Sequence, residues 1–129
     1  MSNPQIPPWL QEQIMKFQQS QQNLQHILMQ KQELQRQTSE SKHALEELEK
    51  ASDTDTVYKR AGSIMIKSKK SILISDLGEI QELAKTKSAV LEKQETQLKT
   101  SLQEQETKIN EMITKTQSQP GTTNLNPPK

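Results

Sequence analysis

The stretch TVYKRAGSIMIK, residues 56–67, decides the fold because it places a short β-like insert between two long helical patterns. Two runs of β-branched or aromatic residues flank Gly62, which is a pattern that predicts a β-hairpin. Residues 52–55 are all Ser, Asp or Thr, and these residue types form turns and end helices. The chain is therefore predicted to leave one helix, form a hairpin and enter a second helix.

Outward from the insert, apolar residues recur at spacings of three and four on both sides. The first line contains Leu10, Ile14, Phe17, Gln21, Leu24, Leu28, Lys31, Leu34, Thr38, Ser41, Leu45 and Leu48. The second line, read backward, contains Met112, Ile109, Gln105, Leu102, Leu98, Glu95, Leu91, Lys87, Ala84, Ile80 and Leu77. The two lines pair from Ile14 with Met112, through Leu45 with Ile80, to Leu48 with Leu77. Forward steps on the first line match backward steps on the second, as an antiparallel helical pair requires, except that the step of three from Lys31 faces a step of four from Glu95.

We call the predicted contact between the two lines the seam. It includes polar as well as apolar residues. Gln21 is expected to share an amide hydrogen bond with Gln105, and Lys31 is expected to pair with Glu95. Near that charge pair, each line has one break in its heptads, and the two breaks are opposite in sense. These polar residues are interpreted as fixing the register of the helices. A seam weak enough to splay apart is the alternative.

The expected segments are a flexible stretch over 1–8, a coiled-coil helix over 9–51, a hairpin assembly region over 52–70, a lead-in with the second helix over 71–116, and a disordered tail over 117–129. The secure part of the second helix is predicted from Leu77, with Asp76 and Glu79 as a capping box. Residues 71–74 fit either a strand or the lead into this helix.

The composition limits the classes of protein that this chain can represent. Only 29% of its 129 residues are hydrophobic, so a conventional globular core is not expected. The net charge is +1 with both signs interspersed, which argues against nucleic acid as a partner. No cysteine and no long apolar stretch are present, so a cytoplasmic protein without a membrane segment is expected.

No catalytic, metal or cofactor site is predicted. His26 and His43 lie on separate helical faces without further ligands at metal-binding spacing, and they are interpreted as surface residues. The basic run at residues 67–70 is interpreted as a solvated loop or strand edge.

Two apolar groups are the candidate binding surfaces. An isolated two-stranded hairpin is marginally stable in water, so this hairpin is expected to assemble with others into a sheet or barrel; folding onto its own helices is the alternative. The hairpin residues concerned are Val57, Tyr58, Ile64, Met65 and Ile66. The second group gathers where the chain enters and leaves the helical pair, and consists of Trp9, Leu10, Ile14, Met15, Phe17, Ile109, Met112 and Ile113. Trp9, Met15 and Ile113 fall off the seam and are therefore the best candidates for exposed contacts, whereas the others can also close the coiled coil.

The local sequence resembles the beta-type subunits of the archaeal prefoldin family. ALEEL at residues 44–48, VYK at 57–59 followed by Gly62, IMIK at 64–67 and EKQE at 92–95 carry the resemblance, which covers residues 9–116. One hairpin rather than two is similar to the beta type. Residues 71–75 depart from the family pattern, which has a usually acidic helix start at this place.

This resemblance implies a mainly α fold in which a long antiparallel two-helix coiled coil is joined by one β-hairpin that assembles into an oligomeric β-barrel platform. It implies a hexamer of two alpha-type and four beta-type subunits, ATP-independent capture of unfolded polypeptides at the coiled-coil tips, and delivery to a group II chaperonin. No cofactor is implied. The alternative function is a structural coiled-coil adaptor that binds folded partners.

Overall fold

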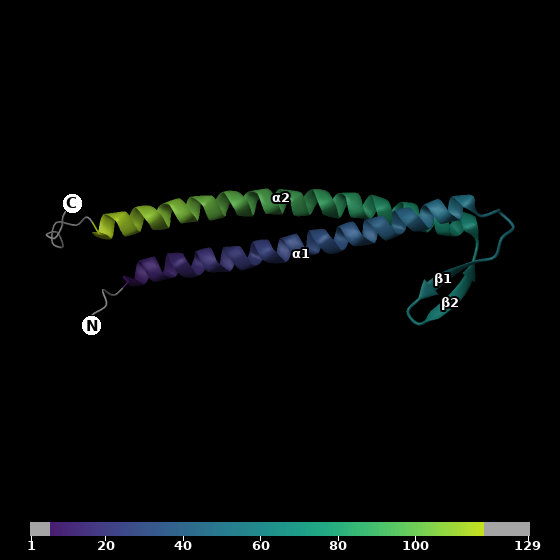
Figure 1. Cartoon of the computed structure of the whole chain (residues 1–129), viewed down its shortest axis with the longest axis horizontal. Coiled ribbons are helices and arrows are strands. Elements are labelled where there is room, and N and C mark those ends of the chain that lie inside the picture. The colour runs from purple at the N-terminus through teal and green to yellow at the C-terminus, as the bar shows by residue number, and fades with distance from the viewer. Residues whose placement is uncertain (1–5, 118–129) are drawn as a thin grey trace. The chain divides into compact units, whose positions relative to one another are not determined.

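The computed structural model describes residues 6–117, with side chains described over 6–115. In chain order its elements are helix α1 (Pro8–Lys50), strands β1 (Val57–Ala61) and β2 (Ile64–Ser68), and helix α2 (Lys70–Gln117) (Figure 1). The two strands form an antiparallel sheet. Two long helices with a single hairpin between them confirm the predicted mainly helical fold class.

Helix α1 is continuous because no glycine or proline occurs between its second residue and its end at Lys50. Pro8 is its first residue, a position where the missing N–H would have no helical partner. The carbonyl of Pro7 accepts hydrogen bonds from the amides of Leu10 and Gln11, each at 3.0 Å. The proline pair therefore starts the helix rather than delaying it.

A tight turn follows the end of α1. The amide of Asp55 donates to the carbonyl of Ser52 at 3.0 Å, and the amide of Ser52 donates back to Oδ2 of Asp55 at 2.7 Å. Lys70, in the first turn of α2, donates from Nζ to the carbonyl of Ala51 at 2.7 Å and lies 3.6 Å from Oδ1 of Asp53. This lysine ties the end of α1 to the start of α2, and it satisfies a carbonyl that the helix leaves unpaired.

The hairpin closes through the two residues Gly62 and Ser63. Its register pairs Ala61 with Ile64 and continues to Val57 opposite Ser68. Gly62 has a φ of 64°, which is the left-handed region that glycine enters without steric cost. Glycine at the first of two central residues is typical of a type II′ turn, whose twist matches that of paired strands.

Helix α2 begins at Lys70, so residues 71–74 are helical and do not extend the hairpin. The predicted capping box is wrong, because Asp76 and Glu79 lie inside the helix. The amide of Leu73 already donates to the carbonyl of Lys69 at 3.0 Å. Leu73, Ile74 and Leu77 are all half-buried at helical spacing, and their packing sets the helix start further upstream than the cap signal indicated.

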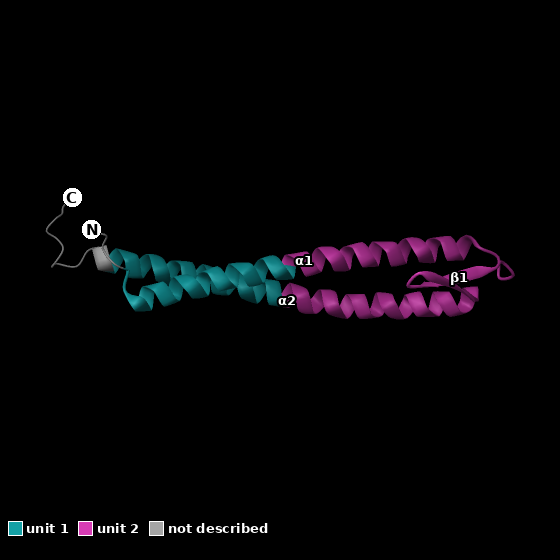
Figure 2. Ribbon diagram, turned by 90° about the horizontal axis from the view of Figure 1, so that it is seen from below, with its two compact units in different colours: residues 1–27, 94–129 teal, residues 28–93 magenta. Residues whose placement is uncertain are grey.

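The chain divides into two compact units, coloured separately in Figure 2. Unit 1 comprises residues 1–27 and 94–129, and unit 2 comprises residues 28–93. The division falls at the paired heptad breaks that the sequence places near Lys31 and Glu95. Each unit brings together one segment of α1 and one segment of α2, as the antiparallel pairing predicts.

Burial within each unit follows the predicted seam with four exceptions. In unit 1, Leu10 and Ile109 are buried and Gln21 is exposed. Unit 2 buries the small residue Ser41 and leaves Thr38, Lys87 and Ile80 exposed. The other predicted seam positions of the two units are half-buried. Half-burial is what a pair of helices with no third layer can provide for its contact residues.

Candidate functional site

The described chain offers surfaces rather than an enclosed reaction centre. Among residues 6–117 there is no cluster of three acidic or histidine side chains that could hold a metal ion. Within the same residues, neither helix has an apolar stretch that could span a bilayer. The candidate site is therefore sought among exposed apolar side chains, beginning with those that the sequence singled out.

In unit 1, the start of α1 exposes two of the three off-seam candidates. Trp9 keeps 47% of its surface exposed and Met15 keeps 67%. Ile6, just before the helix, is also exposed, although the sequence placed it in a flexible segment. Large exposed apolar side chains are typical of contact surfaces, and the unbranched methionine can adapt to partners of different shape. We call these three exposed residues, which fall within residues 6–15, the entry patch: Ile6, Trp9 and Met15.

The remaining members of the predicted tip group lie on or near the seam of unit 1. Leu10 is 5% exposed and Ile109 is 9% exposed, so both are core residues of this unit. Four further members are half-buried, namely Ile14, Phe17, Met112 and Ile113. Ile113 is thus less exposed than its off-seam position indicated. These six side chains are therefore buried or half-buried, in contrast to the exposed entry patch.

In unit 2, the hairpin exposes four of its five predicted assembly residues. Tyr58, Ile64, Met65 and Ile66 are exposed, and Val57 is half-buried. Because successive strand residues point to opposite faces, Ile64 and Ile66 lie on one face of the hairpin and Met65 lies on the other. Among the described residues each strand pairs only with the other, so each has one unpaired edge. The hairpin therefore has exposed apolar side chains on two faces as well as open edges.

A groove of about 550 Å³ lies between the hairpin and the adjoining helical segments of unit 2. Its lining includes Leu48, Val57, Met65, Leu73, Leu77 and Ile80. Lys59 of β1 reaches toward α2, where its Nζ lies 3.8 Å from Oδ2 of Asp76. Ile80 was predicted to pack on the seam against Leu45, but it is exposed and lines this groove. Its neighbour Gln81 is half-buried instead.

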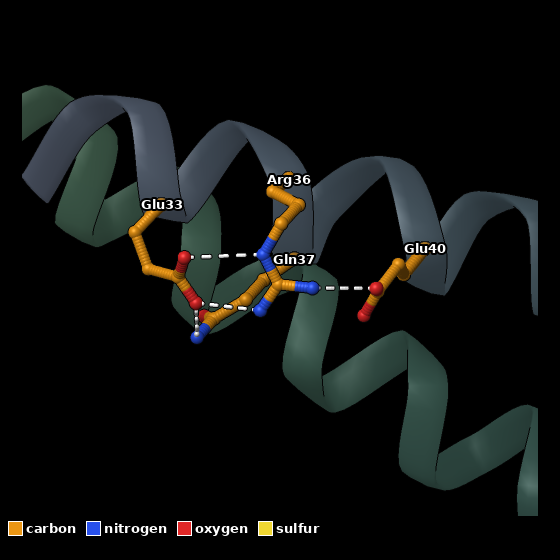
Figure 3. A network of polar contacts seen from close by, with 4 residues as sticks. All are labelled: Glu33, Arg36, Gln37 and Glu40. Carbon is orange, nitrogen blue, oxygen red and sulfur yellow. Dashed lines mark hydrogen bonds and ion pairs between the residues drawn. The ribbon is translucent and has the colours of Figure 1, made fainter. Parts of the chain in front are cut away.

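Four polar side chains on α1, namely Glu33, Arg36, Gln37 and Glu40, form a network of hydrogen bonds and ion pairs (Figure 3). Arg36 bonds Glu33 through two nitrogens, at 3.1 and 2.6 Å, and bonds Glu40 at 2.5 Å. Gln37 also donates to Glu33 at 3.1 Å. The hydrogen bond from Arg36 is the main reason why the pKa of Glu33 lies below its ordinary value. These contacts run between neighbouring helical turns, so they stiffen α1 and form no ligand site.

Sequence reasoning missed a second exposed apolar line on α2. Ile72, Leu83 and Val90 are all exposed. Their spacings of 11 and 7 residues are both close to whole helical turns, so the three side chains share one face of α2. The signal was available in the sequence, but the stronger seam pattern on the same helix obscured it. Met29 of α1, which is 65% exposed, was missed because it stands alone.

Comparisons with known proteins agree on one family. The family model described as "Prefoldin subunit" matches residues 11–116. The chain is 34% identical over 120 residues to prefoldin subunit beta of Saccharolobus islandicus, covering 93% of this chain and 95% of that protein. It is 35% identical over 108 residues to prefoldin subunit beta of Methanosarcina acetivorans, covering 84% and 92%. The crystal structure of the prefoldin beta subunit from Thermococcus strain KS-1 matches with a TM-score of 0.72 and 34% identity, over 87% of this chain and 96% of that one.

Proposed function

Because the chain belongs to the prefoldin family of chaperone subunits, we propose that it is a beta-type subunit that holds unfolded polypeptides without ATP and passes them to a group II chaperonin. The proposal includes an alpha-type partner and a hexamer of two alpha and four beta subunits. It also includes a cytoplasmic location, which a chain without cysteine favours.

The exposed entry patch is the observation that carries the capture role. An unfolded polypeptide offers apolar side chains in no fixed arrangement, so its receptor must tolerate many shapes. Trp9 supplies a large rigid contact area, and Met15 supplies an adaptable one. Leu10, Ile14, Phe17, Ile109, Met112 and Ile113 complete the proposed tip site as its packed support.

Affinity in this proposal comes from the number of subunits rather than from the strength of one contact. A single patch of two or three exposed side chains binds weakly. When several subunits of one assembly contact the same polypeptide, each further contact becomes intramolecular, and the combined affinity can exceed a single affinity by about 10²–10⁴-fold. The exposed hairpin residues Tyr58, Ile64, Met65 and Ile66 support the assembly role, because burying them between subunits removes apolar surface from water.

The test is suppression of aggregation of a chemically denatured enzyme by this chain assembled with an alpha-type subunit. The double variant Trp9→Ser/Met15→Ser should lose most of the protection while keeping its helix content, because both side chains are exposed and contribute little to the fold. Met29→Ser is the matched control, because Met29 is as exposed as Met15 and lies on the same helix in unit 2. It should protect as well as the unaltered chain.

The outcomes separate the candidate functions. Equal protection by the double variant and the control would remove the entry patch from the mechanism. An unaltered assembly that gives no protection at all would contradict the holdase proposal and would favour the alternative, a structural coiled-coil adaptor.

A further inference from the structure

The hairpin of this chain is strongly basic, although the chain as a whole is nearly neutral. Residues 56–75 contain five cations and no carboxylate. The cations are Lys59, Arg60, Lys67, Lys69 and Lys70. The excess of positive charge is therefore confined to the segment that exposes the apolar assembly residues.

Only two of the five cations have acidic partners among residues 6–115. Lys59 lies 3.8 Å from Asp76, and Lys70 is anchored between Asp53 and the carbonyl of Ala51. Arg60 donates from Nε to the carbonyl of Gly62 at 3.2 Å, and it lines the groove of unit 2 together with Glu47 and Asp76 but forms no ion pair with either. The other three cations form no ion pair with a carboxylate among residues 6–115, namely Arg60, Lys67 and Lys69.

Two of the cations without an ion pair, Arg60 and Lys67, share one face of the hairpin with apolar side chains. The register places Tyr58 opposite Lys67 and Arg60 opposite Met65. Directly opposed residues, and residues two apart on a strand, point to the same side of a sheet. All four side chains are exposed, and three of them, Tyr58, Arg60 and Met65, also line the groove of unit 2 described above, so this face and the groove form one surface. We call Tyr58, Arg60, Met65 and Lys67 the basic face.

Covering the basic face has opposite consequences for two kinds of partner. A second copy of this chain would bring a like-charged hairpin against it, and cations would be taken from water without counter-charges. A hairpin that carries carboxylates would gain ion pairs while burying the same tyrosine and methionine. The apolar residues therefore favour assembly, and the cations determine with which subunit it occurs.

We propose that the basic face docks against a hairpin of a different subunit that carries acidic side chains, and that its charge disfavours pairing with another copy of this chain. The inference rests on the proposed assembly function and adds the chemistry by which the partner is selected. Nucleic acid is a poorer match, because only two free cations share this face and the end of α1 in the same unit is acidic through Glu46, Glu47 and Glu49.

The test uses a charge-reversed form of the chain itself as the acidic partner. Arg60→Glu/Lys67→Glu keeps the apolar hairpin residues but reverses the basic face. Isotope-labelled unaltered chain is mixed in equal amounts with this variant, and mixed and unmixed oligomers are counted by native mass spectrometry at low and high salt. Mixed oligomers should exceed the unmixed ones by roughly tenfold at low salt, and the excess should fall toward the statistical ratio at high salt.

Two further variants keep the test decisive. Lys16→Glu/Lys93→Glu reverses the same number of exposed cations on the helices and should produce no such preference. Arg60→Gln/Lys67→Gln only neutralises the basic face, and it should raise self-association of the chain by roughly tenfold at low salt. Circular dichroism of each variant verifies that the helices are retained.

The results distinguish this inference from the proposed function. Oligomers that form in statistical ratios at every salt concentration would overturn charge selection while leaving assembly intact. Folded chains that do not associate in any mixture would overturn both the docking surface and the assembly part of the proposed function. Tight binding of a single-stranded oligonucleotide by the unaltered chain, lost in Arg60→Gln/Lys67→Gln, would overturn the inference in favour of a nucleic-acid surface.

Discussion

Gln105 shows how a polar residue behaves in the seam of unit 1. It is half-buried, and its Oε1 atom is buried without a hydrogen-bond partner among the described residues. The predicted partner, Gln21, is exposed. The pattern thus located Gln105 on the packed side of α2 but not its hydrogen bonding, because rotamers and local helix rotation decide whether two amides meet.

Replacing Gln105 with leucine should stabilise the chain. The change removes a buried oxygen that forms no hydrogen bond among the described residues, and it adds apolar surface at a packed position. We therefore expect the free energy of unfolding to rise by about 1–2 kcal/mol. Urea denaturation followed by circular dichroism measures this difference. Gln103→Leu, at an exposed position two residues away, is the control and should change stability by less than about 0.5 kcal/mol. A stabilisation equal to that of the control would mean that the amide is solvated in solution.

At the scale of elements, glycine is used in two different ways within one unit. Gly62 has a positive φ in the hairpin turn, and Gly78 lies inside α2. An added Cβ would meet no atom within 4 Å at either position, so backbone conformation alone distinguishes them. This makes the two sites a matched pair for testing the turn.

Alanine should have opposite effects at these two glycines. Gly62→Ala should destabilise the hairpin by about 1 kcal/mol or more, because an L-residue is strained at this φ. Gly78→Ala should stabilise α2 by about 0.5–1 kcal/mol, because alanine has the higher helix propensity. Amide hydrogen exchange in β1 and β2 measures the first effect, and thermal unfolding measures the second. Similar effects of both changes would argue against the turn geometry described above.

The ion pairs along α1 predict a pH dependence of helix stability. The pKa of Glu33 is lowered in the folded chain, chiefly by its hydrogen bond from Arg36, so its contribution is present above the ordinary value of 4.5 and is lost as pH falls through the lowered pKa. Arg36→Gln should therefore lower the unfolding temperature slightly, by roughly one to a few degrees, near neutral pH. The difference from the unaltered chain should disappear in strong acid.

Lys93→Gln is the control for this experiment, because it removes an exposed cation for which no ion pair is seen among the described residues. Melting curves recorded at several pH values would contradict the interpretation if the effect of Arg36→Gln were the same in acid and at neutral pH.

For the whole molecule, the order of elements was predictable because long uninterrupted heptads and one Gly-centred insert leave few other arrangements. The start of α2 was not, because Leu73 and Ile74 pack as helix residues despite a downstream cap signal. The tip group was only partly predictable. Trp9 and Met15 follow from their off-seam positions, whereas the exposure of Ile6 and the half-burial of Ile113 depend on how the termini of the helices pack.

The hairpin should be required for assembly but not for helix formation. Replacing residues 57–68 with a short Gly/Ser linker should leave far-UV circular dichroism nearly unchanged, because both helices lie outside the replaced segment. The same variant should not form a hexamer with an alpha-type subunit in light scattering. Leu83→Ser/Val90→Ser, which alters exposed residues of α2 in the same unit, should still assemble. A hexamer formed without the hairpin would place the assembly contacts elsewhere.

Leu10 and Ile109 are the only buried apolar side chains among residues 6–115, and this sets the calorimetry of the isolated chain. The heat capacity of unfolding grows with the apolar surface that becomes newly hydrated, so the isolated chain has a smaller value per residue than a globular domain of its length. Its free energy of unfolding therefore curves only weakly with temperature. If neighbouring subunits cover the exposed hairpin residues, unfolding of the assembly exposes more apolar surface, and the free energy of unfolding curves more strongly with temperature.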